Sequence, residues 1–192
     1  MSTNNGCEIW PPYEVFYIHA MLFNSSSALE SIELIRDELE RSSNVASDNS
    51  SFTRSTLLNH LQNVVVQAAA LSRYLWPARR GREIRAKQLR DALEVTGSSP
   101  LIKRDLRNEI EHFDEKLDAY LADGISGYVV PELVAPFPKN NDASCHIFRA
   151  YYTDVGVFEM LGKRYEFQPF AEEVERIHER LLVLDRKGGR LE

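Results

Sequence analysis

Residues 101–121 carry the longest uninterrupted helical pattern in the chain, and this stretch constrains the fold more than any other. Pro100 precedes the pattern and Gly124 follows it, which is typical of the start and the end of a helix. The apolar residues recur three and four positions apart, at Leu106, Ile110, Phe113, Leu117 and Tyr120. Because such a stripe needs a core to face, the pattern predicts an amphipathic helix packed against other elements.

The polar residues of the same stretch gather away from the stripe. At about 100° per residue, Arg104, Asn108, His112 and Glu115 share the far side of the expected helix, and Arg107 lies on its flank. The long Arg107 side chain can reach either way, so Arg107, Asn108 and His112 can converge on one point outside the core. The alternative is a solvated helix face whose charges form ordinary ion pairs.

Helical periodicity also predicts the elements around this stretch. We expect one helix over residues 12–41, with a weak point at 24–27, and a second that Ser51 or Thr53 begins and that ends at Leu75. A short basic helix should occupy residues 79–94. A C-terminal helix should occupy residues 169–185. Residues 1–10 should be loose and residues 42–52 should form a flexible loop, because their composition buries little.

The character of the sequence changes after Gly124. Residues 128–130 and 133–134 read as short extended pieces that Pro131 interrupts. Alternating patterns and turn signals then predict strands within residues 144–167, arranged as a small antiparallel hairpin or a three-stranded meander. The fold class expected from the whole pattern is mainly α, a four- to five-helix up-and-down bundle with this small β-element near the C-terminus.

Length and composition point to one ordinary globular domain. A chain of 192 residues with 43% hydrophobic and 27% charged residues can build a single core over residues 1–192. We expect no membrane contact, because no run approaches the roughly 18 apolar residues that a span needs. Residues 1–14 do not resemble a secretory signal, and two cysteines are too few for a disulfide framework, so the expected setting is cytoplasmic.

Charge is distributed unevenly along the chain. The net charge is −6, but residues 73–107 contain ten basic and four acidic residues and are therefore +6, which leaves the rest at −12. This basic segment runs into the 101–121 stretch, so it can collect phosphate groups. The candidate phosphate or RNA contacts are Arg79, Arg80, Lys103 and Arg104. A solvated helix face and a basic loop remain the alternative interpretation.

The sequence predicts neither a cofactor nor a metal. It contains no P-loop and no dinucleotide fingerprint. Cys145 and His146 are adjacent, so on a strand only one of them can point into a given metal site. His19 and His60 lie singly on amphipathic helices, where a structural role is the more frequent one.

The segment Arg107-Asn108-Glu109-Ile110-Glu111-His112 resembles the signature of the HEPN superfamily. That signature is an arginine, four to six residues and a histidine on a late helix of a helical bundle, and a polar residue, often asparagine, follows the arginine. A second match, from Arg54 to His60, lacks the asparagine and falls at a helix start, so we do not assign it.

The resemblance implies a metal-independent endoribonuclease in which two motif helices meet across a homodimer interface and build one active site. It implies His112 as general base or acid, Arg107 as the ligand of the phosphate and its transition state, and Asn108 as an orienting group. The product would be a 2′,3′-cyclic phosphate. A toxin or defence role with a cognate antitoxin or other partner protein fits this class. The alternatives are a non-catalytic dimeric module that binds a protein or a nucleotide, and a purely structural helical protein.

Overall fold

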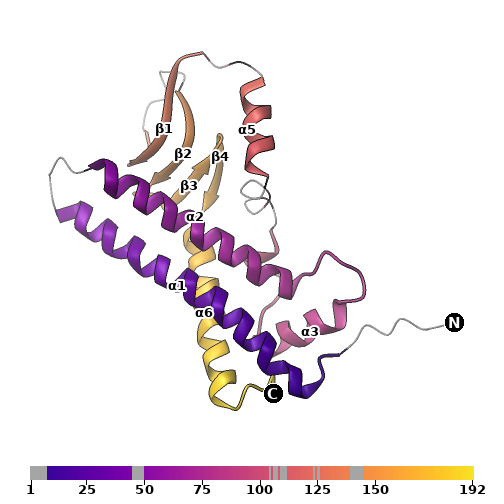
Figure 1. Cartoon of the computed structure of the whole chain (residues 1–192). Helices are drawn as coiled ribbons and strands as arrows, with labels where there is room; N and C mark the ends of the chain where they lie inside the picture. Colours follow the sequence, from indigo (N-terminus) through magenta and orange to yellow (C-terminus); the bar gives the residue numbers. More distant parts are fainter. Residues whose placement is uncertain are drawn as a thin grey trace.

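The computed structural model describes residues 8–44, 50–103, 105, 108, 112–122, 124, 126–138 and 145–192. The described part is mainly helical and carries a small sheet near its C-terminal end, as expected (Figure 1). Its helices are α1 (Glu14–Asn44), α2 (Ser50–Leu75), α3 (Glu83–Ala92), α5 (Phe113–Ala122) and α6 (Gln168–Arg186). Short 3₁₀ turns at Pro11–Tyr13 and Pro100–Ile102 precede α1 and follow α3.

Helices α1 and α2 form a long antiparallel hairpin (Figure 1). Both reach into the loop predicted over residues 42–52, because α1 ends at Asn44 and α2 begins at Ser50. The weak point predicted at residues 24–27 does not break α1. There Asn24 Nδ2 donates to the Ala20 carbonyl at 2.7 Å and Ser25 Oγ donates to the Leu22 carbonyl at 3.2 Å, so these side chains turn back onto their own helix.

Helix α6 packs along α1 in the opposite direction. Its buried residues recur at helical spacing, at Ala171, Val174, Ile177, Leu181 and Leu184, and form one apolar stripe on the C-terminal helix that the sequence predicts. Contacts of His19 with Asp185 and of Ser25 with His178 fix the antiparallel register. The main core therefore lies between α1, α2 and α6, and α3 closes the end where α2 stops (Figure 1).

The N-terminal stretch is more ordered than its composition suggests. Residues 1–7 lie outside the described residues, but Ile9 is buried and its backbone N–H donates to Gln88 Oε1 of α3 at 2.8 Å. The expectation that all of residues 1–10 are loose is therefore wrong for Ile9. The Ile9 side chain is removed from water and its backbone N–H has a hydrogen-bond acceptor in α3, so this residue is held in place.

The sheet has the order β1-β2-β3-β4, with β1 (Tyr128–Ala135), β2 (Cys145–Tyr152), β3 (Val157–Met160) and β4 (Lys163–Glu166). Strands β2, β3 and β4 form the antiparallel meander that the sequence predicted. Residues 128–135, however, are one continuous strand, and β1 pairs with β2 in parallel. Pro131 is tolerated because β1 is an edge strand, where a missing backbone donor can face away from the neighbour.

The stretch of residues 101–121 is not one uninterrupted helix. A 3₁₀ turn over Pro100–Ile102 buries Leu101 and ends at Lys103, whose backbone is extended. His112 lies in a turn, and α5 begins only at Phe113. Of the expected apolar stripe, Phe113, Leu117 and Tyr120 are half-buried against the core. Leu106 and Ile110 lie outside the described residues, as do Arg104 and Arg107.

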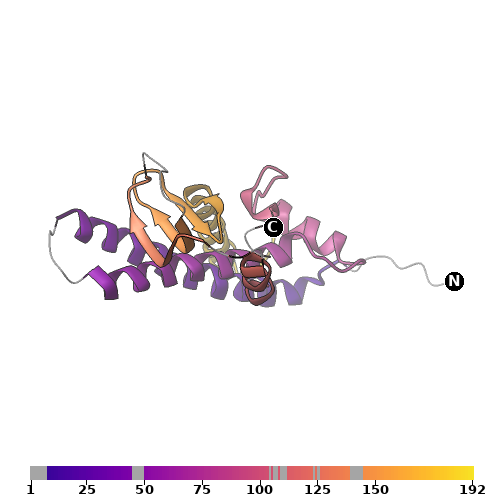
Figure 2. The ribbon, with the colours of Figure 1, turned by 90° about the horizontal axis from the view of Figure 1, so that it is seen from above.

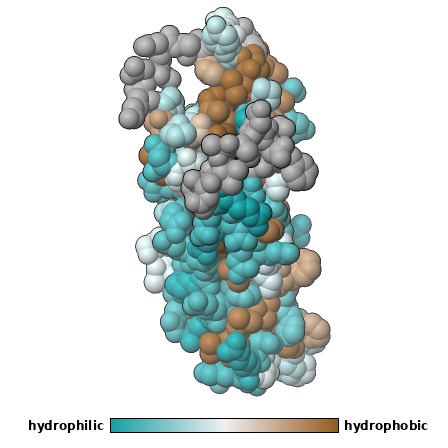
Figure 3. All heavy atoms as spheres, turned by 90° about the vertical axis from the view of Figure 1, so that its left-hand side faces the viewer, coloured by the Kyte–Doolittle hydropathy of each residue, from teal (hydrophilic) through white to brown (hydrophobic). Residues whose placement is uncertain are grey.

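Seen from above, the hairpin of α1 and α2 forms one layer, and the sheet with α6 lies behind it (Figure 2). On the face shown in Figure 3, hydrophobic surface gathers at the upper end, smaller hydrophobic patches lie near the lower end, and the surface between them is mostly hydrophilic. Tyr128 and Val129 of the edge strand β1 are exposed. No helix in the described ranges combines the length and the apolar character of a membrane span.

Candidate functional site

Three cationic side chains meet in an open cleft between α5 and β4. The cleft has a volume of about 580 Å³, and its lining consists of Asp105, Asn108, Lys116, Lys163, Arg164 and Tyr165. Lys116 comes from the first turns of α5, and the tight turn at Leu161-Gly162, where both residues have positive φ, starts β4 at Lys163. Asn108 is thus the motif residue that the structure brings to a cationic surface.

A buried carboxylate orients Arg164 at this cleft. Arg164 Nε donates to Glu159 Oε2 at 2.6 Å, and its guanidinium lies 4.8 Å from the centre of the Phe137 ring. Glu159 also accepts the Tyr152 hydroxyl at 3.2 Å, and burial, followed by the Glu159 charge, raises the pKa of Tyr152. The three cations of the lining outnumber Asp105 and the Glu159 carboxylate that pairs with Arg164, so the cleft keeps a small positive excess and favours anions.

His112 lies one helical turn from Asn108, at the entrance to α5. Its backbone N–H donates to the Asn108 carbonyl at 3.0 Å, and its side chain is 56% exposed. His112 Nδ1 is 3.8 Å from Glu115 Oε2, so a protonated imidazole has a carboxylate neighbour. His112 is not part of the cleft lining, and its exposed side chain follows Asn108 by one helical turn.

The remaining predicted site residues lie elsewhere. Lys103 is exposed directly after the Pro100–Ile102 turn. Arg79 and Arg80 are exposed in the connection between α2 and α3, at the end of α2 away from the sheet and α5 (Figure 1). The structure therefore does not bring Arg79 and Arg80 together with Asn108 and His112. Arg104 and Arg107 are not among the described residues.

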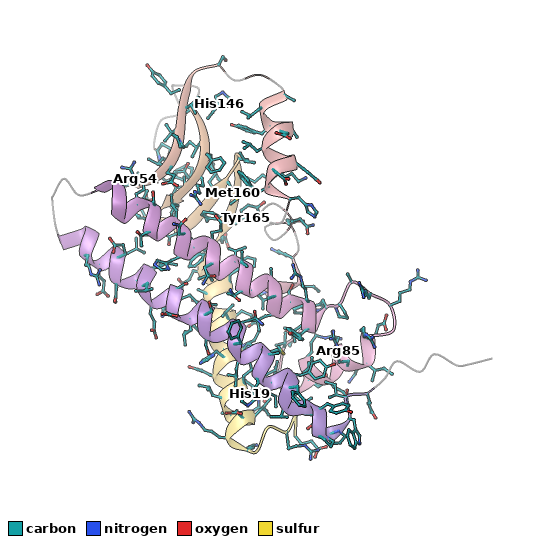
Figure 4. All side chains as sticks on the ribbon, in the orientation of Figure 1. His19, Arg54, Arg85, His146, Met160 and Tyr165 are labelled. Carbon is teal, nitrogen blue, oxygen red and sulfur yellow. The ribbon has the colours of Figure 1, made fainter. Side chains whose placement is uncertain are left out.

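Much of the basic segment around α3 stabilises the C-terminal end of α2. Arg85 donates to the carbonyls of Arg73 and Tyr74 at 3.4 Å each and lies over the Tyr17 ring (Figure 4). Arg90 donates to the Leu75 carbonyl. A helix C-terminus presents unsatisfied carbonyls and a partial negative charge, which these guanidinium groups neutralise. For Arg85 and Arg90 the structural interpretation of the basic segment is therefore correct.

A smaller pocket adjoins the cleft. It has a volume of about 170 Å³ and is lined by Gln62, Phe113, Phe148, Arg149 and Met160. The rings of Phe113 and Phe148 meet edge to face at 4.8 Å. Met160 pairs with Lys163 in the sheet, and Phe113 precedes Lys116 by one helical turn, so pocket and cleft share the β3–β4 hairpin and the start of α5. Figure 4 shows Met160 and Tyr165 in this region beside α5.

A polar network that sequence patterns do not reveal supports this pocket. Glu132 of β1 accepts Ser55 Oγ at 2.5 Å and two Arg149 nitrogens at 3.1 and 2.6 Å. Arg149 also donates to Gln62 Oε1 at 2.9 Å. The Ser55 hydrogen bond lowers the pKa of Glu132 most, and Arg149 lowers it further against the effect of burial. The parallel pairing of β1 with β2 places Glu132 beside Arg149, and nothing in the sequence signals that pairing.

Three histidines outside the motif have structural partners. His146 Nε2 contacts the Ser126 carbonyl at 3.1 Å, so this nitrogen carries the proton and Nδ1 accepts the Tyr120 hydroxyl at 2.9 Å. His178 Nδ1 lies 2.9 Å from Ser25 Oγ between α6 and α1, and burial lowers the pKa of His178. His19 pairs with Asp185 at 3.0 Å on the surface. The structural role expected for His19 fits this contact.

Within the described ranges, no three histidine, cysteine, aspartate or glutamate side chains are grouped so that they could hold a metal ion. Comparisons with protein-family models, with curated proteins and with solved structures find no significant match to this chain. A function for this chain is therefore inferred from its residues and from the geometry of the cleft.

Proposed function

We propose that this protein is a HEPN-like, metal-independent endoribonuclease that acts as a homodimer. One observation carries the proposal: Asn108 lines a cationic cleft with Lys116, Lys163 and Arg164, and the exposed His112 lies one turn away. A phosphodiester backbone supplies the repeated negative charge that such a cleft binds. An exposed imidazole next to a bound phosphate is suited to proton transfer.

The reaction assigned to this site is an internal transesterification. The 2′-oxygen attacks the adjacent phosphorus and gives its proton to a base, the bond from phosphorus to the 5′-oxygen breaks, and an acid protonates that leaving oxygen. The products are a 2′,3′-cyclic phosphate and a 5′-hydroxyl. His112 serves as base or acid, Arg107 stabilises the charge on the phosphoryl oxygens, and Asn108 orients the phosphate. The second copy in the dimer supplies a second His112 for the other proton.

The proposal also includes a cellular compartment and a biological role. A cytoplasmic toxin or defence protein with a cognate antitoxin or other protein partner would use this activity. Cys145 is an exposed free thiol, which is in keeping with a reducing compartment.

A second candidate function is a non-catalytic module that binds a nucleotide. The pocket between Phe113, Phe148 and Met160 favours it, because its volume of about 170 Å³ suits a single ring system. An engineered apolar cavity of about 150 Å³ binds benzene, for comparison. Arg149 and Gln62 would offer donors to the edge of a base, and the adjoining cationic cleft would take the phosphate.

Cleavage of labelled single-stranded RNA in EDTA tests the proposal. The full-length protein should cleave. His112→Ala should reduce the rate by roughly 10²- to 10⁴-fold, as the loss of a proton-transfer group does. Arg107→Ala should reduce it by roughly 10²- to 10³-fold, as the loss of a group that stabilises transition-state charge does. His19→Ala is the matched control, because His19 is similarly exposed, at 62%, and pairs with a carboxylate in the same way. A 2′,3′-cyclic phosphate should terminate the 5′-fragment.

Two results would decide against the enzyme. Cleavage that survives both motif substitutions would assign the activity elsewhere. Nucleotide binding without cleavage of any RNA would favour the binding module.

A further inference from the structure

Four aromatic side chains near the start of α1 are exposed although they are large and apolar. Trp10, Tyr13, Phe16 and Phe23 are 59%, 54%, 69% and 76% exposed, and we call these four residues the aromatic face. The Trp10 and Tyr13 rings meet edge to face at 5.0 Å, and the Tyr13 and Phe16 rings are 6.4 Å apart. The rings thus form one surface: the first three are in contact in sequence order, and Phe23 follows Phe16 by two helical turns on the same side of α1.

The charge pattern of α1 sets this half of the helix apart. Residues 15–29 contain no aspartate, glutamate, lysine or arginine. The following residues of the same helix carry the charges of an ordinary solvated face, Glu30, Glu33, Arg36, Asp37, Glu38, Glu40 and Arg41. A helix face that stays in water is normally polar, so the N-terminal half of α1 has the composition of a covered face and the C-terminal half does not.

The charged groups that contact this half of α1 are bound away from the aromatic face. Arg85 of α3, which lies over the Tyr17 ring, donates to the carbonyls of Arg73 and Tyr74. Glu14 is buried and accepts Arg190 Nε at 2.6 Å and the Leu191 backbone N–H at 3.1 Å. His19 pairs with Asp185. The aromatic face therefore offers no cation to a nucleic acid or to an anionic lipid headgroup, and surface-binding helices of membranes are rich in lysine and arginine.

The area of the aromatic face fits a contact between two copies. A tyrosine, tryptophan or phenylalanine presents 150–250 Å², so the exposed parts of the four side chains amount to roughly 500–600 Å² per copy. Two such faces bury roughly 1,000–1,200 Å², which is close to the lower limit of a specific interface. The exposed Val66 of α2 enlarges this surface. Asn63 contacts Ser27, and Tyr17 contacts Tyr74. These contacts set the register of the α1–α2 hairpin and place Val66 level with Phe23.

We propose that the aromatic face is the homodimer interface, with the α1 helices of two copies packed against each other across a two-fold axis. Phe16, Ala20 and Phe23 follow one another at i, i+4 and i+7 and form the seam, and the small Ala20 lets the two backbones approach. An uncharged surface can meet its own copy without like-charge repulsion, which an isologous contact requires. The inference does not depend on the proposed nuclease activity, and it departs from the expectation that the motif helices themselves form the interface, because the seam lies on α1 and His112 lies at the start of α5.

Sedimentation equilibrium of the full-length chain tests the interface. The unaltered protein should sediment as a dimer, at twice the monomer mass of 22.0 kDa. Phe16→Asp with Phe23→Asp should sediment as the monomer, because two carboxylates per copy would be buried in the seam. Leu34→Asp is the matched control: Leu34 is an exposed apolar residue of the charged half of α1, at 40%, and its substitution should leave the dimer intact.

Trp10 gives a second measurement that needs no substitution in the interface. In Trp76→Phe protein Trp10 is the remaining tryptophan, and its emission should move to longer wavelength on dilution as the interface opens. Phe16→Ser and Phe23→Ser should raise the dissociation constant while circular dichroism reports an unchanged fold.

A monomeric unaltered protein, or a dimer that survives both charged substitutions, would overturn the inference. A dimer of this kind that leaves RNA intact would uphold the interface and count against the nuclease.

Discussion

His178 is a titratable residue whose protonation should couple to folding. It lies buried between α6 and α1 beside Ser25, and burial lowers its pKa below the ordinary value of about 6.5. The unfolded chain therefore takes up a proton at a higher pH than the folded chain does. The contribution of His178 to stability is present above pH 6.5 and is lost as the pH falls through the lower folded pKa.

We therefore expect the melting temperature to fall as the pH is lowered from about 7 through the ordinary histidine pKa. The melting temperature of His178→Gln should be lower than that of the unaltered protein at pH 7, and it should fall less as the pH is lowered. His19→Gln, which removes an exposed histidine, should keep the fall intact. Differential scanning calorimetry across this pH range measures the effect, and parallel curves for the His178→Gln variant and the unaltered protein would contradict it.

A second prediction concerns the half-buried pair of Glu132 and Arg149. Glu132→Gln leaves Arg149 without its counter-charge and weakens the Ser55 hydrogen bond, so the free energy of unfolding should fall by about 1.5–3 kcal/mol. Asp91→Asn, which removes the exposed partner of Lys87, should cost less than about 1 kcal/mol. Urea denaturation compares the two variants, and equal losses would show that burial of the Glu132 pair adds nothing.

At the scale of elements, α5 is held to the sheet by few contacts. Phe113 packs on Phe148 at one end, and Tyr120 bonds His146 at the other. Tyr120→Phe removes a hydrogen bond of about 1 kcal/mol, so amide exchange in the second half of α5 should accelerate roughly fivefold, while α1 is unaffected. Tyr128→Phe removes an exposed hydroxyl and serves as the control. Unchanged protection in α5 would contradict this attachment.

The elements divide into those that local sequence determines and those that it does not. Helices α1, α2 and α6 follow from apolar periodicity, and the turn signals at residues 153–156 and 161–162 predict the meander. The parallel pairing of β1 with β2 depends on contacts between two separate segments. Periodicity within one segment does not show which strand it pairs with. The pattern over residues 101–121 continues through Lys103, but the 3₁₀ turn that Pro100 begins buries Leu101 and ends there in extended backbone. Tertiary packing overrides helix propensity at that position.

At the scale of the whole molecule, the candidate site joins segments far apart in the chain. The sequence pattern points to Asn108 and His112, but Lys163 and Arg164 reach the cleft only because the meander folds back beside α5. Charge along the sequence pointed to Arg79 and Arg80, which lie at the other end of α2. The linear charge pattern also could not show that Arg85 and Arg90 are bound to the α2 carbonyls.

This geometry predicts which cations bind RNA. Lys163→Ala should weaken the binding of single-stranded RNA and reduce the slope of log affinity against log salt by about 0.7, the value for one lost phosphate contact. Arg79→Ala with Arg80→Ala, at the other end of α2, should change neither quantity appreciably. Fluorescence anisotropy at several salt concentrations measures both. If the Arg79→Ala, Arg80→Ala variant bound RNA more weakly than Lys163→Ala, the RNA-binding site would lie on the basic segment and not in the cleft.

The hydrogen bonds between Glu14 and the C-terminal residues have a consequence for biosynthesis. The Glu14 carboxylate is bound by Arg190 and Leu191, which follow it by 176 and 177 residues. In a chain leaving the ribosome, the Glu14 carboxylate therefore stays in water without these two partners until residues near 190 have emerged. The contacts that fix the start of α1 to the C-terminal end can therefore form only after nearly all of residues 1–192 have been made.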